Sequence, residues 1–179
     1  MNYTNSNVVA NNGAINITSV NNDTNIIGAN VAAENIAITS GGDLNVASLQ
    51  NTSKSKSKSK DIGVGGGGRN SGSLSYNSSR SSFERNWVDD QTSIIADENL
   101  TITSIGNSDV KGAIIANITN YVDGDGNANN DKGSWVDGGG LEINTGTLTF
   151  SDIIDTEKQE SSGFGFSSNV LLGRNASGG

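Results

Sequence analysis

Residues 31–40, with the sequence VAAENIAITS, recur as IADENLTITS at residues 95–104, and six of the ten positions are identical. After the shared asparagine, apolar and polar residues alternate in both copies. Alternation places Ile36 and Ile38 on one side of an extended chain and Ala37 on the other. This pattern is typical of a β-strand with one buried face. The fold is therefore expected to rest on a strand that is repeated along the chain.

Shorter copies of the strand lie on either side of this pair. The sequence INITSV at residues 15–20 matches LTITSI at 100–105, and LEIN at 141–144 has the same alternation. The equivalent positions 15, 36, 100 and 141 are separated by 21, 64 and 41 residues, close to one, three and two times 21. A period of about 20 residues is typical of a β-solenoid, in which each coil stacks on the next. Eight or so coils, at about 4.8 Å each, would form a rod roughly 40 Å long.

The alternation also assigns the two faces of the coil. The predicted core positions are Ile15, Ile17, Ile36, Ile38, Leu100, Ile102, Leu141 and Ile143. The outer face would carry Asn16, Ala37, Thr101 and Glu142. Asn35 and Asn99 fall at the same repeat position, so their side chains are expected to stack and hydrogen-bond along the rod. Glycines expected at turns with positive φ are Gly28, Gly41, Gly42, Gly106 and Gly112.

The composition supports an all-β chain and excludes several kinds of site. Ile and Val total 28 against 8 Leu, and β-branched residues favour strands. The chain has no His and no Cys, which removes imidazole bases, thiolate nucleophiles and zinc sites with nitrogen or sulfur ligands. Its net charge of −8 argues against nucleic-acid binding. Neither a transmembrane helix nor a signal peptide is expected from the sequence, and no cofactor is predicted.

Two stretches interrupt the period and are predicted to be loops or hairpins extruded from the coil. Residues 51–90 contain a Ser/Lys run followed by glycines, and residues 119–139 contain a cluster of Asp, Asn and Gly. Such clusters mark turns and supply no buried strand. Trp87 and Trp135 each begin a Trp-Val-Asp sequence at the end of an excursion. We expect these tryptophans to pin the returning chain onto the rod.

Several stretches together resemble the haemagglutinin-repeat region of filamentous-haemagglutinin-like exoproteins, a family that includes the large effectors of contact-dependent growth inhibition. They are GGDLNVASLQ at 41–50, the Ser/Lys run of 51–60 leading to Gly-Val-Gly at 63–65, DVKGAIIA at 109–116, TGTLTFSDI at 145–153 and the restarted Ser/Gly tract at 161–166. The resemblance covers most of residues 13–179.

The resemblance implies a right-handed parallel β-helix of about 20-residue coils. Residues 1–179 would be a single segment of a longer filament, with one repeat unit at about 13–92 and a second at about 93–179. The resemblance further implies export by an outer-membrane two-partner-secretion transporter and a secreted location at the bacterial cell surface. The segment would be a non-catalytic stalk used for cell contact, adhesion or delivery of a C-terminal toxin to neighbouring bacteria.

The lysines Lys54, Lys56, Lys58 and Lys60 form the one basic cluster of this acidic chain. One interpretation is contact with anionic lipid or lipopolysaccharide phosphates on the surface or outer membrane of a target cell, where each Lys would contribute about 1 kcal/mol. The other is a solvated segment whose charges keep neighbouring strand edges away.

A metal site and an enzyme site are the remaining alternatives. Asp123, Asp125, Asn127 and Asp131 resemble a calcium loop, but Ala128 and Ser134 replace its usual Gly and Glu, so no metal is expected. A carbohydrate-active β-helix would need two carboxylates facing one groove, about 5 to 9.5 Å apart. The tight carboxylate groupings are Asp89 with Asp90 and Asp152 with Asp155. Neighbouring strand positions point to opposite faces, so we expect no catalysis.

Overall fold

The computed structural model describes residues 1–67, 71–120 and 135–171. These residues form eleven β-strands and no helix, so the predicted all-β class is confirmed. They accordingly include no helix with the length and hydropathy needed to cross a membrane. The chain forms two compact units, residues 1–51 with 87–155, and residues 52–86 with the chain from 156 onward. Each compact unit combines segments from both of the predicted repeat units, about 13–92 and about 93–179.

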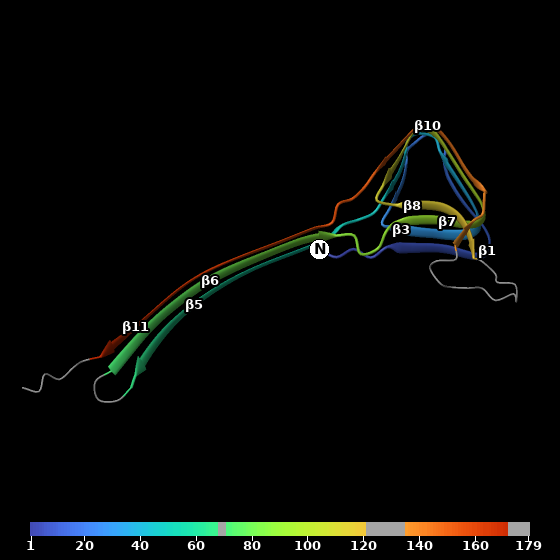
Figure 1. Cartoon of the computed structure of the whole chain (residues 1–179). Coiled ribbons are helices and arrows are strands. Elements are labelled where there is room, and N and C mark those ends of the chain that lie inside the picture. Colours follow the sequence, from blue (N-terminus) through green and yellow to red (C-terminus); the bar gives the residue numbers. More distant parts are fainter. Residues whose placement is uncertain (68–70, 121–134, 172–179) are drawn as a thin grey trace, which may run out of the picture. The chain divides into compact units, whose positions relative to one another are not determined.

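Eight strands form the first unit, and its main sheet is parallel. They are β1 (Ser6–Ser19), β2 (Thr24–Ile27), β3 (Ala29–Ser40), β4 (Leu44–Ala47), β7 (Ser93–Lys111), β8 (Ile114–Asn120), β9 (Trp135–Asp137) and β10 (Leu141–Ser151). The exception is β9, which pairs with β8 in the antiparallel direction. Figure 1 shows the parallel strands of this unit curling around a triangular outline.

Three parallel ladders make up the curled sheet, and each has four levels in the described residues. Representative register positions are Val8, Val31, Ile94 and Ile115; Ile15, Ile36, Leu100 and Leu141; and Ile26, Val46, Val110 and Phe150. Apolar residues therefore stack on apolar residues from level to level. A single level cannot bury its apolar face alone, so stacking creates the core.

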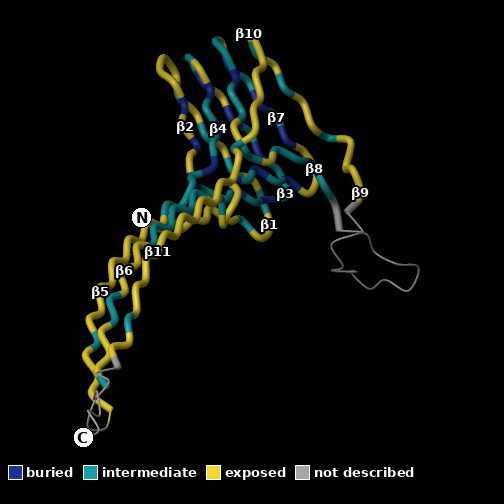
Figure 2. The backbone as a smooth tube through the Cα atoms, turned by 60° about the vertical axis from the view of Figure 1, so that its left-hand side comes forward, coloured by how far each residue is buried: buried dark blue, intermediate teal, exposed yellow. Residues whose placement is uncertain are grey.

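Most of the core lies in the two middle levels, which have a neighbour on each side, and Ile26 of the first level adds to it (Figure 2). Of the eight predicted core residues, the buried ones are Ile36, Ile38, Leu100 and Ile102. Partly buried ones are Ile15, Ile17 and Ile143. Leu141 is 43% exposed, contrary to expectation. Its strand, β10, lies at an end of the stack and is covered on one side, whereas Leu100 is covered on both.

The expectation of about eight coils is wrong. Ile36 pairs directly with Leu100, and Leu100 pairs directly with Leu141. The intervals of 64 and 41 residues therefore each separate adjacent levels, where the sequence suggested three and two coils. The first interval contains residues 52–86, which belong to the second unit. The second contains residues 121–134, which lie outside the described residues. Both intervals therefore lie close to multiples of 21 residues although each corresponds to a single level. The described stack has four levels.

The second unit is a three-stranded sheet in the order β11-β6-β5, formed by β5 (Asn51–Gly66), β6 (Ser71–Trp87) and β11 (Thr156–Leu171). β6 is antiparallel to β11. It is also antiparallel to β5, because Thr52 contacts Asn86 and Gly65 contacts Ser73. The predicted hairpin within residues 51–90 is therefore confirmed, and Figure 1 shows the three long strands side by side.

The glycines at the corners of the first unit serve two different purposes. Gly28 and Gly112 have φ of 60° and 55°, as predicted. Gly41, Gly42 and Gly106 do not have positive φ, so that prediction is wrong for them. Instead the turns of adjacent levels stack closely, and a Cβ added at Gly41 would overlap the carbonyl oxygen of Val20.

Candidate functional site

The four lysines of the Ser/Lys run lie on one face of the second unit. Because alternate residues of a strand point to opposite faces, Lys54, Lys56, Lys58 and Lys60 share a face of β5. All four are exposed. The intervening serines Ser53, Ser55, Ser57 and Ser59 lie on the other face and are also exposed. We call the side that carries the lysines the lysine face.

Neighbouring strands add further charges to the lysine face. The Nζ atom of Lys54 lies 2.8 Å from Oε1 of Glu84 on β6. On β11, the Nζ atom of Lys158 lies 2.7 Å from Oε1 of Glu160. Arg80 on β6 pairs with Ser162 on β11 and shares this face. Among the described residues, no ion pair is found for Lys56, Lys58, Lys60 or Arg80. The lysine face therefore carries an excess of positive charge.

The ion pairs shift the pKa values of their members. A hydrogen bond from Lys54 and its charge lower the pKa of the Glu84 carboxyl, and the charges of Lys158 and Lys56 add to this. The hydrogen bond and charge of Lys158 lower the pKa of Glu160, and Glu160 raises the pKa of Lys158 in turn. These side chains are exposed, so the pairs contribute little to the free energy of unfolding.

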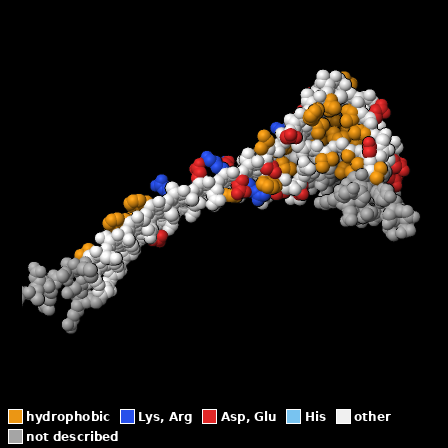
Figure 3. Space-filling model, in the orientation of Figure 1, with side chains coloured by type: hydrophobic (Ala, Val, Ile, Leu, Met, Phe, Trp, Pro, Cys, Tyr) orange, Lys and Arg blue, Asp and Glu red, His pale blue; other side chains and the backbone are white. Residues whose placement is uncertain are grey.

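An apolar patch continues the lysine face along the same three strands. Its members keep the alternation of the lysines on β5, of Glu84 on β6 and of Lys158 on β11. They are Ile62, Val64, Leu74, Phe164, Phe166 and Val170, and each is at least half exposed. Hydrophobic side chains and Lys or Arg side chains lie along the same border of this sheet in Figure 3. The lysine face thus joins a cationic region to an aromatic and aliphatic region.

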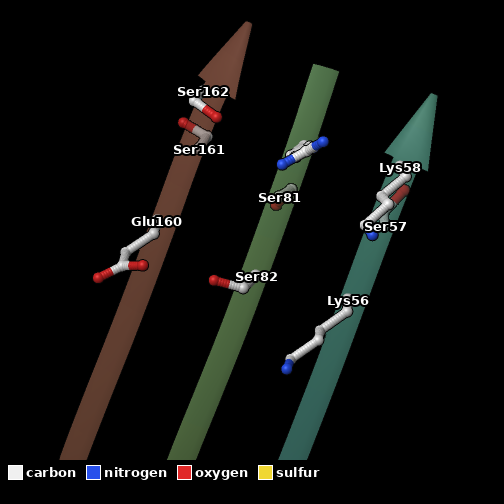
Figure 4. Close-up of a pocket in the computed structure, with 9 residues that line it drawn as sticks. Lys56, Ser57, Lys58, Ser81, Ser82, Glu160, Ser161 and Ser162 are labelled. Carbon is white, nitrogen blue, oxygen red and sulfur yellow. The ribbon is translucent and has the colours of Figure 1, made fainter. Parts of the chain in front are cut away.

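A depression of about 370 Å³ lies among the charged side chains of the second unit. Lys56, Lys58, Arg80, Ser82 and Glu160 contribute to its lining. In Figure 4, Lys56 extends from β5 toward β6, on which Ser82 is seen, and Glu160 lies on β11 beyond it. Three cations, one carboxylate and several serines border this space, so its net positive charge suits phosphate or sulfate oxygens better than a metal ion.

Two of the four carboxylates considered for an enzyme site accept structural hydrogen bonds. Oδ1 of Asp155 accepts a hydrogen bond of 2.9 Å from the backbone N–H of Val88. Oδ2 of Asp89 accepts a hydrogen bond from the side-chain amide of Asn51. Asp152 and Asp155 do line one depression of about 390 Å³, with Ile153 between them. Both residues therefore border one depression, and the carboxylate of Asp155 also fastens the chain at Val88.

No metal site is found in residues 1–67, 71–120 and 135–171, because they contain no group of three or more acidic side chains that could hold an ion. The weak calcium candidate formed by Asp123, Asp125, Asn127 and Asp131 lies outside the described residues. So does the side chain of Trp135. Trp87 ends β6 and is 39% exposed, so it is not part of the buried core.

A buried polar corner of the first unit was missed by sequence reasoning. Thr92 is fully buried, and its Oγ1 accepts a hydrogen bond of 2.9 Å from the N–H of Gly28 and donates one of 2.7 Å to the carbonyl of Ala47. The N–H of Thr92 donates to Oγ of Ser48, which donates to the carbonyl of Gly112. These bonds join three levels of the stack between the end of β4 and the start of β7.

Comparison with known proteins links part of the chain to a family. The family model described as Hemagglutinin repeat matches residues 1–64, which contain β1 to β4 and most of β5. This is about a third of the chain, and it supports the resemblance inferred from the sequence. No curated protein and no solved structure matches the chain.

Proposed function

We propose that this chain is a non-catalytic stalk segment of a secreted bacterial surface exoprotein, built as a right-handed parallel β-helix. The observation that carries the proposal is the set of three parallel ladders with apolar residues at equivalent positions on four levels. Such a coil grows by adding levels, so it suits a part that spans distance. The match of residues 1–64 to the haemagglutinin repeat supports the same role.

In this proposal the parent protein crosses the outer membrane through a two-partner-secretion transporter and remains at the cell surface. There the stalk would serve adhesion, cell contact or delivery of a C-terminal toxin to a neighbouring bacterium. A parallel coil without disulfides is compatible with export as an extended chain, because its backbone hydrogen bonds form between successive levels as they emerge.

The surface contacted by the stalk would be the envelope of the target cell, and the lysine face is the part suited to it. Lys56, Lys58, Lys60 and Arg80 offer cations to lipid or lipopolysaccharide phosphates. The adjacent aromatic residues Phe164 and Phe166 suit the boundary between headgroups and acyl chains. The carbohydrate-active alternative has less support, because the carboxylates of Asp89 and Asp155 already accept structural hydrogen bonds.

The test measures binding of the labelled chain to vesicles with and without anionic lipid across a salt series. A variant with Lys56→Ser, Lys58→Ser and Lys60→Ser should lose most of its binding, while Lys54 stays paired with Glu84. The matched control adds Ser55→Lys, Ser57→Lys and Ser59→Lys to that variant, which restores the net charge on the opposite face. Recovery of binding in the control would mean that net charge alone drives association. Binding indifferent to both salt and substitution would overturn the envelope contact.

A further inference from the structure

β5 and β11 are equivalent strands, 104 residues apart, that flank β6 in the same way. Thr52 donates a hydrogen bond of 3.1 Å from Oγ1 to Oδ1 of Asn86, and Nδ2 of Asn86 donates one of 3.2 Å to Oγ1 of Thr156. Lys54 and Lys158 likewise lie on either side of Glu84. A single strand, β6, is therefore held by the same residue types on both of its edges.

The same spacing of 104 residues separates equivalent positions in the first unit. Leu44 of β4 and Leu148 of β10 both pair with Ser108 of β7. Val46 and Phe150 both pair with Val110. These residues too are 104 positions apart in the sequence. The structural repeat in both units is consequently about 104 residues, and β11 holds the place in the second copy that β5 holds in the first.

This equivalence identifies the free edge of β11. β5 and β11 run in the same direction, since β6 is antiparallel to both, and they show Lys54 and Lys158 on the same face. The edge of β11 that faces away from β6 therefore corresponds to the edge of β5 that β6 occupies. No strand pairs with that edge in the described part of the chain, because β11 ends the sheet order.

The C-terminal half of β11 leaves this edge open to pairing. Natural edge strands are protected by lysines, prolines or bulges, and an unprotected edge is a template for another strand. Residues 163–171 contain no charged residue and no proline. The pairing of β11 with β6 is continuous from Thr156 to Leu171, without a bulge. The charged residues of β11 are Glu157, Lys158 and Glu160, and they all lie within its first five residues.

We propose that the free edge of β11 binds an extended strand with the sequence pattern of β6, antiparallel and in the register that β6 adopts against β5. The natural donor would be the returning strand of a following repeat, so the sheet would gain one hairpin per repeat. An Asn at the position of Asn86 would lie opposite Thr156, and a Glu at the position of Glu84 opposite Lys158. A tyrosine at the position of Tyr76 would lie beside Phe166, as an aromatic cross-strand pair.

The proposal goes beyond the stalk function, since it concerns the pairing of strands and does not depend on which surface the stalk contacts. The probe is a synthetic peptide of residues 71–88, labelled for fluorescence anisotropy and titrated with the complete chain. Saturable binding of one peptide per chain is expected. A peptide carrying Glu84→Lys places a like charge opposite Lys158 and should bind several-fold more weakly. Absence of saturable binding by the unmodified peptide would overturn the proposal.

Register is tested by disulfide trapping, which is clean because the chain has no cysteine. The Thr156→Cys protein should trap a peptide with Asn86→Cys at least several-fold faster than a peptide with Ser78→Cys, whose cysteine would lie about 27 Å away along the strand. Equal trapping of the two peptides would contradict the register. Far-ultraviolet circular dichroism checks that Thr156→Cys is folded.

Displacement of the protein's own β6 by the peptide must be distinguished from addition at the free edge. A second protein carries Phe83→Cys and Gln159→Cys, which are direct partners in the pairing of β6 with β11. Once this disulfide forms, β6 cannot leave β11. Unchanged peptide affinity in the locked protein is the expected result. Loss of binding on locking would show that the peptide exchanges with β6, and the free-edge site would be rejected.

Discussion

Nδ2 of Asn99 donates a hydrogen bond of 2.8 Å to Oδ1 of Asn35, which lies 64 residues earlier in the chain. Nδ2 of Asn35 in turn donates one of 3.0 Å to a carboxylate oxygen of Glu98. Both asparagines occur where β3 and β7 pass from one face of the coil to the next, and the stacking predicted for them is confirmed. Asparagine thus recurs at this position on the two middle levels, whereas the equivalent residue of β1 is Ala14.

The two middle levels should be much less tolerant of charge than the end level. Ile102 is 1% exposed, so Ile102→Asp would bury an unpaired carboxylate and should lower the free energy of unfolding by about 4 kcal/mol or more. Phe150 occupies a register position of the apolar ladder but is 83% exposed. Phe150→Asp should therefore change the free energy of unfolding by about 0.5 kcal/mol or less. Urea denaturation followed by circular dichroism measures both. Equal losses of the free energy of unfolding in the two variants would show that the position in the apolar ladder, rather than burial, decides the cost of the charge.

The close stacking of turns predicts that Gly41 cannot carry a side chain. In Gly41→Ala the new methyl group would overlap backbone atoms of Val20 and Asn21, and the forced shift should cost about 1–3 kcal/mol. Gly72→Ala is the matched control, since a Cβ at Gly72 would meet no atom within 4 Å. Differential scanning calorimetry should show a lower Tm for the first variant alone. A Tm for Gly41→Ala equal to that of the wild type would contradict the stacked turn.

Strands of the first unit were predictable because alternation is a local property of the sequence. The pairing of Ile36 with Leu100 could not be predicted, because an insertion inside one coil lengthens the interval between two strands without changing the sequence of either strand. The equivalence of β5 and β11 was also hidden. At this offset Thr52, Lys54 and Ser57 recur in β11, as Thr156, Lys158 and Ser161, within tracts rich in Ser and Gly.

The lysines of the candidate site were visible in sequence, but their apolar neighbours were not. Phe164 and Phe166 are about 100 residues away from the Ser/Lys run, and only the pairing of β11 with β6 places them on the lysine face. The buried corner at Thr92 has the same origin, because its partners Gly28 and Ala47 are distant in sequence. Contacts of this kind follow from topology, which local patterns do not specify.

The Thr92 corner should contribute measurably to stability. Thr92→Val keeps the shape of the side chain but leaves the N–H of Gly28 and the carbonyl of Ala47 without their hydroxyl partner. Leaving buried polar groups unsatisfied should cost about 1–3 kcal/mol. Thr39→Val, at an exposed position of β3, is the control and should be nearly neutral. The measurement is the urea concentration at the midpoint of unfolding. An unchanged midpoint for Thr92→Val would mean that water or another group replaces the hydroxyl.

The ion pair between Lys54 and Glu84 predicts a pH dependence confined to acid. Lys54 lowers the pKa of Glu84 in the folded state, so the unfolded chain binds the proton more readily. The contribution of the pair is therefore fully present above the unfolded-state pKa and is lost as the pH falls through the lower, folded-state pKa. Glu84→Gln should reduce the Tm slightly at pH 7, and this difference from the wild type should vanish in acid. Because both side chains are exposed, the effect should be small and should weaken in high salt. Glu142→Gln, on the first unit, is the matched control for removal of a charge. A Glu84→Gln difference that persists unchanged at low pH would show that the substitution acts through packing rather than through the ion pair.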